Sequence, residues 1–211
     1  ALSTRDPKAP IDAEFHGTVD GTPLALAGKL GSIAALSDRS SPFPVSVEGE
    51  VAGRKTAVAV QVLRADRLVE LQGIDVTIGS SNVKGRVEVR GEGPKSAWTV
   101  NLASSALNVG DLPETRPTAT AAKPAVSTGS SRFVFPETAI SFDALRAHNV
   151  TGEVTIGRLT LADGRTLDRV HARFTLRDGK LVAPTVQASG YGGTISGALN
   201  VDATRGRIPA L

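Results

Sequence analysis

The residue types that catalyse reactions or bind metals are sparse in this sequence and lie far apart. Its three histidines, His16, His148 and His171, have no second histidine or carboxylate at the spacing of a zinc site. Cysteine is absent, which excludes disulfides, thiolate metal sites and cysteine nucleophiles. The carboxylates that a glycosidase would pair are mostly turn residues here, namely Asp163, Asp168, Asp178 and Asp202. We therefore expect no enzyme activity, no metal and no cofactor.

Two further patterns in the sequence bear on ligand binding. The run Gly190-Tyr191-Gly192-Gly193 lacks the following helix of a phosphate loop, because residues 194–202 alternate as a strand does. A basic row follows one predicted strand face and consists of Arg169, His171, Arg173 and Arg177. It is either a solvated strand face or a weak basic stripe that meets anionic head groups or a partner. The sequence does not separate these two interpretations.

The composition limits the possible partners and the possible core. Net charge is only +3 and aromatic residues make up 4%, so the clustered cations and stacking rings of a nucleic-acid-binding protein are missing. No stretch approaches the roughly 18 apolar residues of a membrane span. The chain starts at Ala1 and contains no methionine, so we expect a processed or excised piece whose parent carries any membrane anchor elsewhere. A chain without cysteine suits the cytosol and the periplasm equally.

The clearest structural pattern covers residues 168–202. Apolar and polar residues alternate with a period of two, which indicates half-buried β-strands. Asp178-Gly179 and the glycine-rich run at 190–193 separate three such strands, so we predict an antiparallel meander. Pro184 lacks an N–H for the ladder and predicts an edge or a bulge. A phase shift between Ile156 and Leu159 predicts a second bulge.

The same alternation recurs through most of the chain, and patterns with a helical period are almost absent. We predict a first β-meander segment over 1–112, with a helical turn or bend near 68–71. Residues 113–131 are rich in Pro, Thr and Ala and predict a flexible linker or loop. A second β-meander segment follows over 132–211, with a short helix near 142–148.

The predicted strands have one apolar and one polar face, and almost no helix is available as a second layer. We therefore predict an all-β fold: an extended curved antiparallel sheet, a groove or half-open β-meander, with one or two short helices. Its apolar face either folds over on itself or stays partly open for a ligand. The inward residues are predicted to be Val83, Val87, Val89, Trp98, Val100, Val154, Ile156, Val170, Phe174, Leu176, Ile195, Leu199 and Val201.

Residues 73–112 resemble a recurring unit of the AsmA family of bacterial envelope proteins. The unit has a Gly-Ser turn, a strand, a Gly/Pro turn and an ending rich in leucine and serine. The matching residues are Gly79, Ser80, Gly85, Pro94, Leu102, Ser104, Leu107 and Leu112. The second half is similar to the C-terminal region of that family at residues 133–136, 142–145, 178–181 and 192–197.

This resemblance implies a periplasmic β-rich protein whose parent is anchored in the bacterial inner membrane by a segment absent here. AsmA and TamB-like proteins are thought to form long sheets whose apolar groove carries lipid, without catalytic residues or cofactors. The expected function is then a groove segment that binds or conducts acyl chains of phospholipid or another envelope lipid and supports outer-membrane assembly. A dozen strands give a groove of at most about 60 Å, so the chain would be a segment or a capping end.

A different class of function is also compatible with the sequence. A structural or adhesive β-sandwich would close its apolar core and bind a protein or glycan through its loops. A protein partner in the envelope is compatible with both interpretations. The two differ in one feature, which is whether the apolar face is open.

Overall fold

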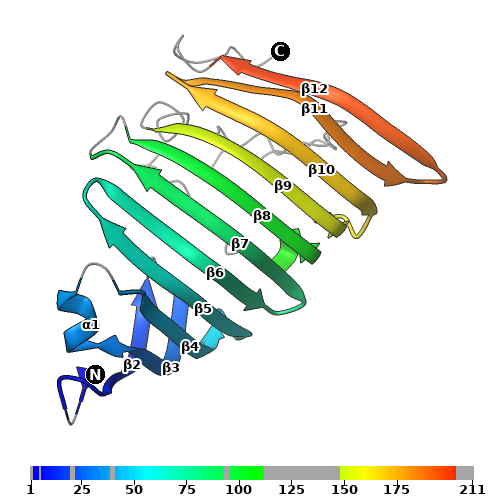
Figure 1. Ribbon diagram of the computed structural model, residues 1–211. Coiled ribbons are helices and arrows are strands. Elements are labelled where there is room, and N and C mark those ends of the chain that lie inside the picture. The colour runs from blue at the N-terminus through cyan, green and yellow to red at the C-terminus, as the bar shows by residue number, and fades with distance from the viewer. Residues whose placement is uncertain are drawn as a thin grey trace, which may run out of the picture.

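A computed structural model describes residues 2–4, 6–19, 22–38, 41–92, 96–111 and 148–202. These residues form a single open sheet of twelve strands whose order in space follows the order in the chain (Figure 1). The first half of the sheet consists of β1 (Leu2–Ser3), β2 (Pro10–Val19), β3 (Thr22–Ser32), β4 (Phe43–Val51), β5 (Arg54–Ala65) and β6 (Leu68–Ile78). The second half consists of β7 (Ser81–Arg90), β8 (Ala97–Asn108), β9 (Asn149–Thr160), β10 (Thr166–Arg177), β11 (Lys180–Gly190) and β12 (Gly193–Asp202). The predicted all-β class is confirmed.

Every neighbouring pair is antiparallel except β8 and β9, which run parallel. Their ladder pairs Trp98 with Val150 and Leu102 with Val154. The sheet is therefore mixed at this one junction, and the two predicted β-segments belong to one continuous sheet. The predicted linker at 113–131 and nearly all of the predicted helix at 142–148 lie outside the described residues.

Tight turns join the strands where the sequence places glycine. Asp178 and Gly179 have positive φ values of 48° and 78°. Tyr191 and Gly192 likewise have positive φ values, of 52° and 79°. Positive φ at both central positions is the type I′ geometry that matches the twist of a β-hairpin. The three-stranded meander predicted for residues 168–202 is thus confirmed as β10, β11 and β12.

Irregularities in the ladders occur at predicted and unpredicted places. The register shifts between Ala183 and Val186, so Pro184 lies in a bulge, as its missing N–H predicted. The bulge predicted between Ile156 and Leu159 does not appear as a register shift in either ladder of β9. The irregularity lies in the neighbouring strand β10, where Arg169 has a φ of 52° and the register with β11 shifts between Asp168 and His171. The prediction of a helical turn or bend near 68–71 was wrong, because Leu68 begins strand β6. An apolar run this short does not distinguish a turn of helix from a strand.

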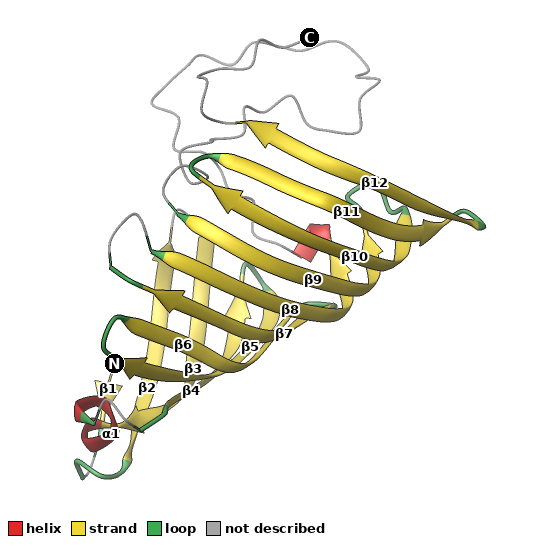
Figure 2. Ribbon diagram, turned by 45° about the horizontal axis from the view of Figure 1, so that its top comes forward, coloured by secondary structure: helices red, strands yellow, loops and turns green. Residues whose placement is uncertain are grey.

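The sheet bends into an open trough (Figure 2). Two glycines on the apolar face, Gly28 and Gly49, lie where the bend brings neighbouring strands close. A Cβ at Gly28 would collide with the backbone of Ser46 and Val47, and one at Gly49 with the carbonyl oxygen of Ala25. Glycine in a strand interior commonly marks such a close approach or a tight bend.

The apolar side of the sheet faces into the bend. The short 3₁₀ helix η2 (Val109–Asp111) lies inside the trough (Figure 2). Its Asp111 contacts Ser81, which pairs with Ile78 and so shares the face of the apolar residues. We call this side the concave face and the opposite side the convex face.

The described residues contain very little closed core. Only five apolar side chains are nearly buried, and none of the described side chains is fully enclosed; the five are Ala13, Ile156, Leu176, Ala183 and Ala188. The helix α1 (Ile33–Ser37) begins after Ser32, whose hydroxyl accepts a hydrogen bond from the N–H of Ala35 at 3.1 Å. Apart from α1 and η2, everything described lies in the sheet or its turns.

Candidate functional site: the concave face

Cross-strand pairing carries one apolar surface across the whole sheet. Residues directly opposite each other in a ladder point to the same face. One row runs from Val47 through Val58, Val76 and Val83, passes the polar Ser104 in β8, and continues with Ile156 and Val170. A second row links Val87, Val100, Gly152 and Phe174. The apolar surface is therefore continuous from β2 to β12.

The register places every inward residue predicted from the sequence on this concave face. In β7, Val83 pairs with Val76, Val87 with Val100 and Val89 with Trp98. In β9, Val154 and Ile156 pair with Leu102 and Ser104, which share the face of Trp98 and Val100. In β10, Val170 pairs with Ile156, Phe174 with Gly152 and Leu176 with Val150. In β12, Ile195, Leu199 and Val201 pair with Ala188, Ala183 and Leu181.

Most of these side chains are half-buried rather than enclosed. Ile156 and Leu176 are the most covered, at 7% and 6% exposed, whereas Ile195 and Leu199 at the sheet edge are 54% and 47% exposed. In a sandwich, a second sheet would pack on such a face and bury it. In the described part of the chain, no second sheet covers it.

Residues of β2 to β6 that were not among the predicted inward residues also lie on the concave face. The register adds Phe15, Leu26, Val45, Val47, Val58, Val62, Leu71 and Val76 to the face. The same period-two alternation runs through these strands, so the signal was present in the sequence. Phe15 is 42% exposed at the first edge of the sheet.

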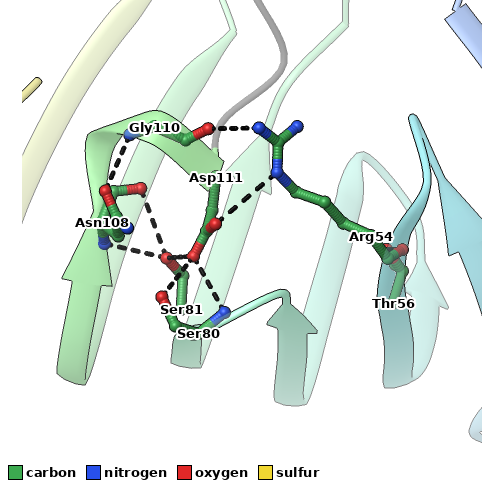
Figure 3. A network of polar contacts seen from close by, with 7 residues as sticks. All are labelled: Arg54, Thr56, Ser80, Ser81, Asn108, Gly110 and Asp111. Carbon is green, nitrogen blue, oxygen red and sulfur yellow. Dashed lines mark hydrogen bonds and ion pairs between the residues drawn. The ribbon is translucent and has the colours of Figure 1, made fainter.

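A polar network closes one rim of the concave face (Figure 3). One Asp111 carboxylate oxygen accepts hydrogen bonds from the hydroxyls of Ser80 and Ser81, at 2.7 and 2.9 Å, and from the Ser80 N–H at 2.9 Å. Arg54 donates to the carbonyl of Gly110 at 2.7 Å, and its Nε lies 3.6 Å from Asp111. These contacts attach η2 to the turn between β6 and β7 and to the start of β5.

The network also sets the charge state of Asp111. Hydrogen bonds from the hydroxyls of Ser80 and Ser81 lower the pKa of Asp111 below its ordinary value, with smaller contributions from the Ser80 N–H and from Arg54. The carboxylate is therefore held in its charged form. Its partners are hydroxyl and backbone groups with no nucleophile–base pair among them, so we interpret the network as a structural clamp.

A cavity of about 640 Å³ lies at the opposite rim, between α1 and the turn from β5 to β6. Its lining combines Leu36 of α1 and Leu68 with Arg64, Arg67 and Glu92. The Arg64 guanidinium stands 5.9 Å from the centroid of the Phe43 ring. The charges of Arg64 and Arg67 face those of Asp66 and Glu92, so the cavity has no net charge of one sign.

The convex face has the opposite chemistry. Charged residues pair directly across neighbouring strands, as with Lys29 and Asp12 at 3.1 Å and Lys84 and Asp75 at 2.8 Å. Such exposed pairs add little stability individually. They keep this face hydrated, so the sheet has one polar, hydrated side and one apolar side.

The basic row predicted in β10 is partly neutralised. Glu153 of β9 lies 2.8 Å from His171 and 3.1 Å from Arg173, while Arg169 donates to the hydroxyl of Ser189 at 2.9 Å. Hydrogen bonds from His171 and then Arg173 lower the pKa of Glu153. His171 and Arg173 of this row therefore belong to a cross-strand network with Glu153 on the convex face.

The other two histidines have local roles. His16 lies 2.9 Å from Glu14 on the same strand. His148 packs against Trp98, with ring centroids 5.2 Å apart, and the indole N–H donates to Ser96 at 2.9 Å. Over the described ranges, no three potential metal ligands cluster.

No family model, no curated protein and no solved structure matches this chain. Among the helices that the structure describes, none is long and apolar enough to cross a membrane. The candidate site therefore stands on the geometry of the concave face alone.

Proposed function

We propose that the concave face binds acyl chains of phospholipid or another envelope lipid. In this proposal the chain is a periplasmic, AsmA-like segment of a parent anchored in the inner membrane, and it supports lipid transport or outer-membrane assembly. The single observation that carries the proposal is the continuous row of half-exposed apolar side chains across the sheet. A contiguous apolar surface of this extent that is exposed to solvent normally marks a binding site.

Acyl chains suit this surface for physical reasons. Each buried methylene gains about 0.8 kcal/mol on leaving water, and a flexible chain adapts to the uneven floor that valines, leucines and glycines create. The face offers few hydrogen-bonding groups away from its rims, which suits a ligand that needs none. A head group would remain at a rim, near water.

The role proposed is binding rather than catalysis. The ion pairs described above lie on the convex face or at a rim, away from the apolar rows. The alternative, a structural or adhesive β-sandwich that binds a protein or glycan, needs another layer over the concave face. The open arrangement of the described strands favours the lipid-binding proposal over this alternative.

Native mass spectrometry of the purified protein, followed by lipid extraction from the same sample, tests the proposal. We expect co-purifying phospholipid or envelope lipid, and uptake of an added fluorescent fatty acid. Val100→Glu places a charge in the middle of the concave face and should abolish both signals. Ala103→Glu is the matched control, because it lies on the convex side of the same strand opposite Lys84.

Circular dichroism and thermal melting establish that both variants fold. If Val100→Glu does not fold, Val100→Thr keeps the shape of the side chain and should lower fatty-acid affinity. An apo mass for the wild-type protein, together with no fatty-acid uptake, would overturn the proposal and favour the closed module with a protein or glycan partner.

A further inference from the structure

The two edges of the sheet differ in their protection against further strand pairing. At the first edge, β1 pairs with Asp12 and Ala13 of β2, and β2 carries Pro10 and the acids Asp12 and Glu14. Proline, charge and a short covering strand are the usual devices that block an edge. Over residues 193–201, β12 contains no proline and no charged residue, residues 193–200 are exposed, and no strand in the described part of the chain covers it.

The register indicates which backbone groups of β12 point outward. Gly190 and Gly193 close the two-residue turn at Tyr191-Gly192, and in such a hairpin the closing pair is the hydrogen-bonded kind. The pairing alternates along the strand, so residues 193, 195, 197 and 199 direct their N–H and C=O groups toward β11. The N–H and C=O groups of residues 194, 196, 198 and 200 then point away from the sheet. Among the described residues, no strand pairs with this side of β12.

The sequence of β12 is self-complementary about its centre. If two copies pair antiparallel with Gly197 opposite Gly197, Ile195 lies opposite Leu199 on the concave side. On the convex side, Thr194 lies opposite Asn200 and Ser196 opposite Ala198. These last pairs bring together the residues whose backbone groups point outward, so the hydrogen-bonding pattern and the side-chain pattern agree in one register.

We propose that β12 pairs antiparallel with β12 of a second copy of this chain, centred on Gly197. The two-fold axis of such a pair is perpendicular to the sheet, so both concave faces lie on the same side and join into one surface. The contact covers Ile195 and Leu199, which are 54% and 47% exposed in the single chain. Because the edge at β2 is protected, the pairing is isologous and closes at two copies.

Cysteine cross-linking tests this register directly, since the natural chain contains no cysteine. Facing residues of a non-hydrogen-bonded antiparallel pair have Cα atoms about 4.5 Å apart, within the range of a disulfide. Gly197→Cys should therefore form a covalent dimer of about twice 21.8 kDa under mild oxidation. The substitution fits, because a Cβ at Gly197 meets no atom within 4 Å.

Two further variants establish the register. Ile195→Cys alone should stay uncross-linked, because the two copies of residue 195 would lie about 13 Å apart along the strands. An equimolar mixture of Ile195→Cys and Leu199→Cys should give the mixed disulfide. Efficient cross-linking of Ile195→Cys with itself, or none for Gly197→Cys, would overturn the proposed pairing.

Sedimentation velocity of the wild-type protein provides the second test. We expect a concentration-dependent dimer that Ala198→Pro abolishes, because proline removes an outward N–H from the interface and leaves the ladder with β11 intact. Ala198→Val keeps this N–H and should remain dimeric. Matching melting temperatures at high dilution show that the variants fold. A wild-type protein that stays monomeric at all concentrations contradicts the proposal.

Discussion

Gly85 lies directly opposite Leu102 in the ladder between β7 and β8, and no room exists there for a side chain on Gly85. A Cβ at this position would collide with the carbonyl oxygen of Asn101 and approach the Leu102 side chain. Gly197 on the edge strand also belongs to the concave face, yet a Cβ there meets nothing within 4 Å. The bend of the sheet thus makes one glycine indispensable and leaves the other replaceable.

Substitution of these glycines by alanine should therefore have opposite effects. Gly85→Ala forces two backbones apart and should lower the free energy of unfolding by about 2 kcal/mol or more. Gly197→Ala should be neutral or stabilising by up to about 1 kcal/mol, because it reduces the freedom of the unfolded chain. Urea denaturation of both variants measures the difference; equal effects would mean that the close approach at Gly85 is absent in solution.

The turn between β4 and β5 offers a stabilising change. Ala52 and Gly53 have φ values of 53° and 72°, which is the type I′ pattern, and alanine is strained in this left-handed region. Ala52→Asn should raise the free energy of unfolding by about 0.5–1 kcal/mol, because asparagine tolerates that conformation. Ala52→Val, with its branched side chain, should lower it. Thermal melting of the two variants against wild type provides the comparison.

Removal of the Asp111 carboxylate should detach η2 from the rim of the sheet. Asp111→Asn keeps the size of the side chain but weakens its acceptance from Ser80 and Ser81, so we expect a lower melting temperature at neutral pH. The pKa of Asp111 is lowered in the folded state, so its contribution is complete above the ordinary aspartate pKa and is lost as pH falls through the folded value.

The difference in melting temperature between wild type and Asp111→Asn should accordingly shrink in acid. Ser80→Ala removes the largest single cause of the pKa shift and should reproduce part of the effect. A difference that stays constant from neutral pH into strong acid would show that charge is not the origin of the clamp.

Glu153 should titrate at a lower pH than an ordinary glutamate. Its carboxylate receives hydrogen bonds from His171 and Arg173 across the ladder between β9 and β10, and these lower its pKa. NMR titration of the Glu153 side chain measures the shift, which His171→Phe should reduce more than Arg173→Gln does. An unchanged titration in His171→Phe would exclude that hydrogen bond as the main cause.

Local sequence patterns were sufficient to predict much of this fold. Alternation and the turn at Asp178-Gly179 predicted β10 to β12, and the missing N–H of Pro184 predicted a bulge. These features depend on residues close together in the chain, where spacing and backbone chemistry act directly.

Features that depend on distant residues were not predicted. The parallel pairing of β8 with β9 has no short turn to set its register, so nothing near Trp98 or Val150 indicates that they are partners. The clamp at Asp111 joins residues about thirty positions apart in the chain. Nothing in the sequence of the Gly79-Ser80 turn indicates that a distant carboxylate accepts its hydrogen bonds. The self-complementarity of β12 has significance only in an edge strand, and no local pattern in the sequence indicates that β12 is one.

The near absence of a closed core has a consequence for how this protein unfolds. Each strand is held by the strand before it and the strand after it, as repeats are in a solenoid, so stability accumulates along one dimension. Native-state hydrogen exchange should therefore show protection that falls from the central strands toward β1 and β12. The strands β8 and β9 are separated by residues 109–148, the longest interval between any two neighbouring strands of the sheet. Their ladder is therefore the natural boundary between two independently opening units.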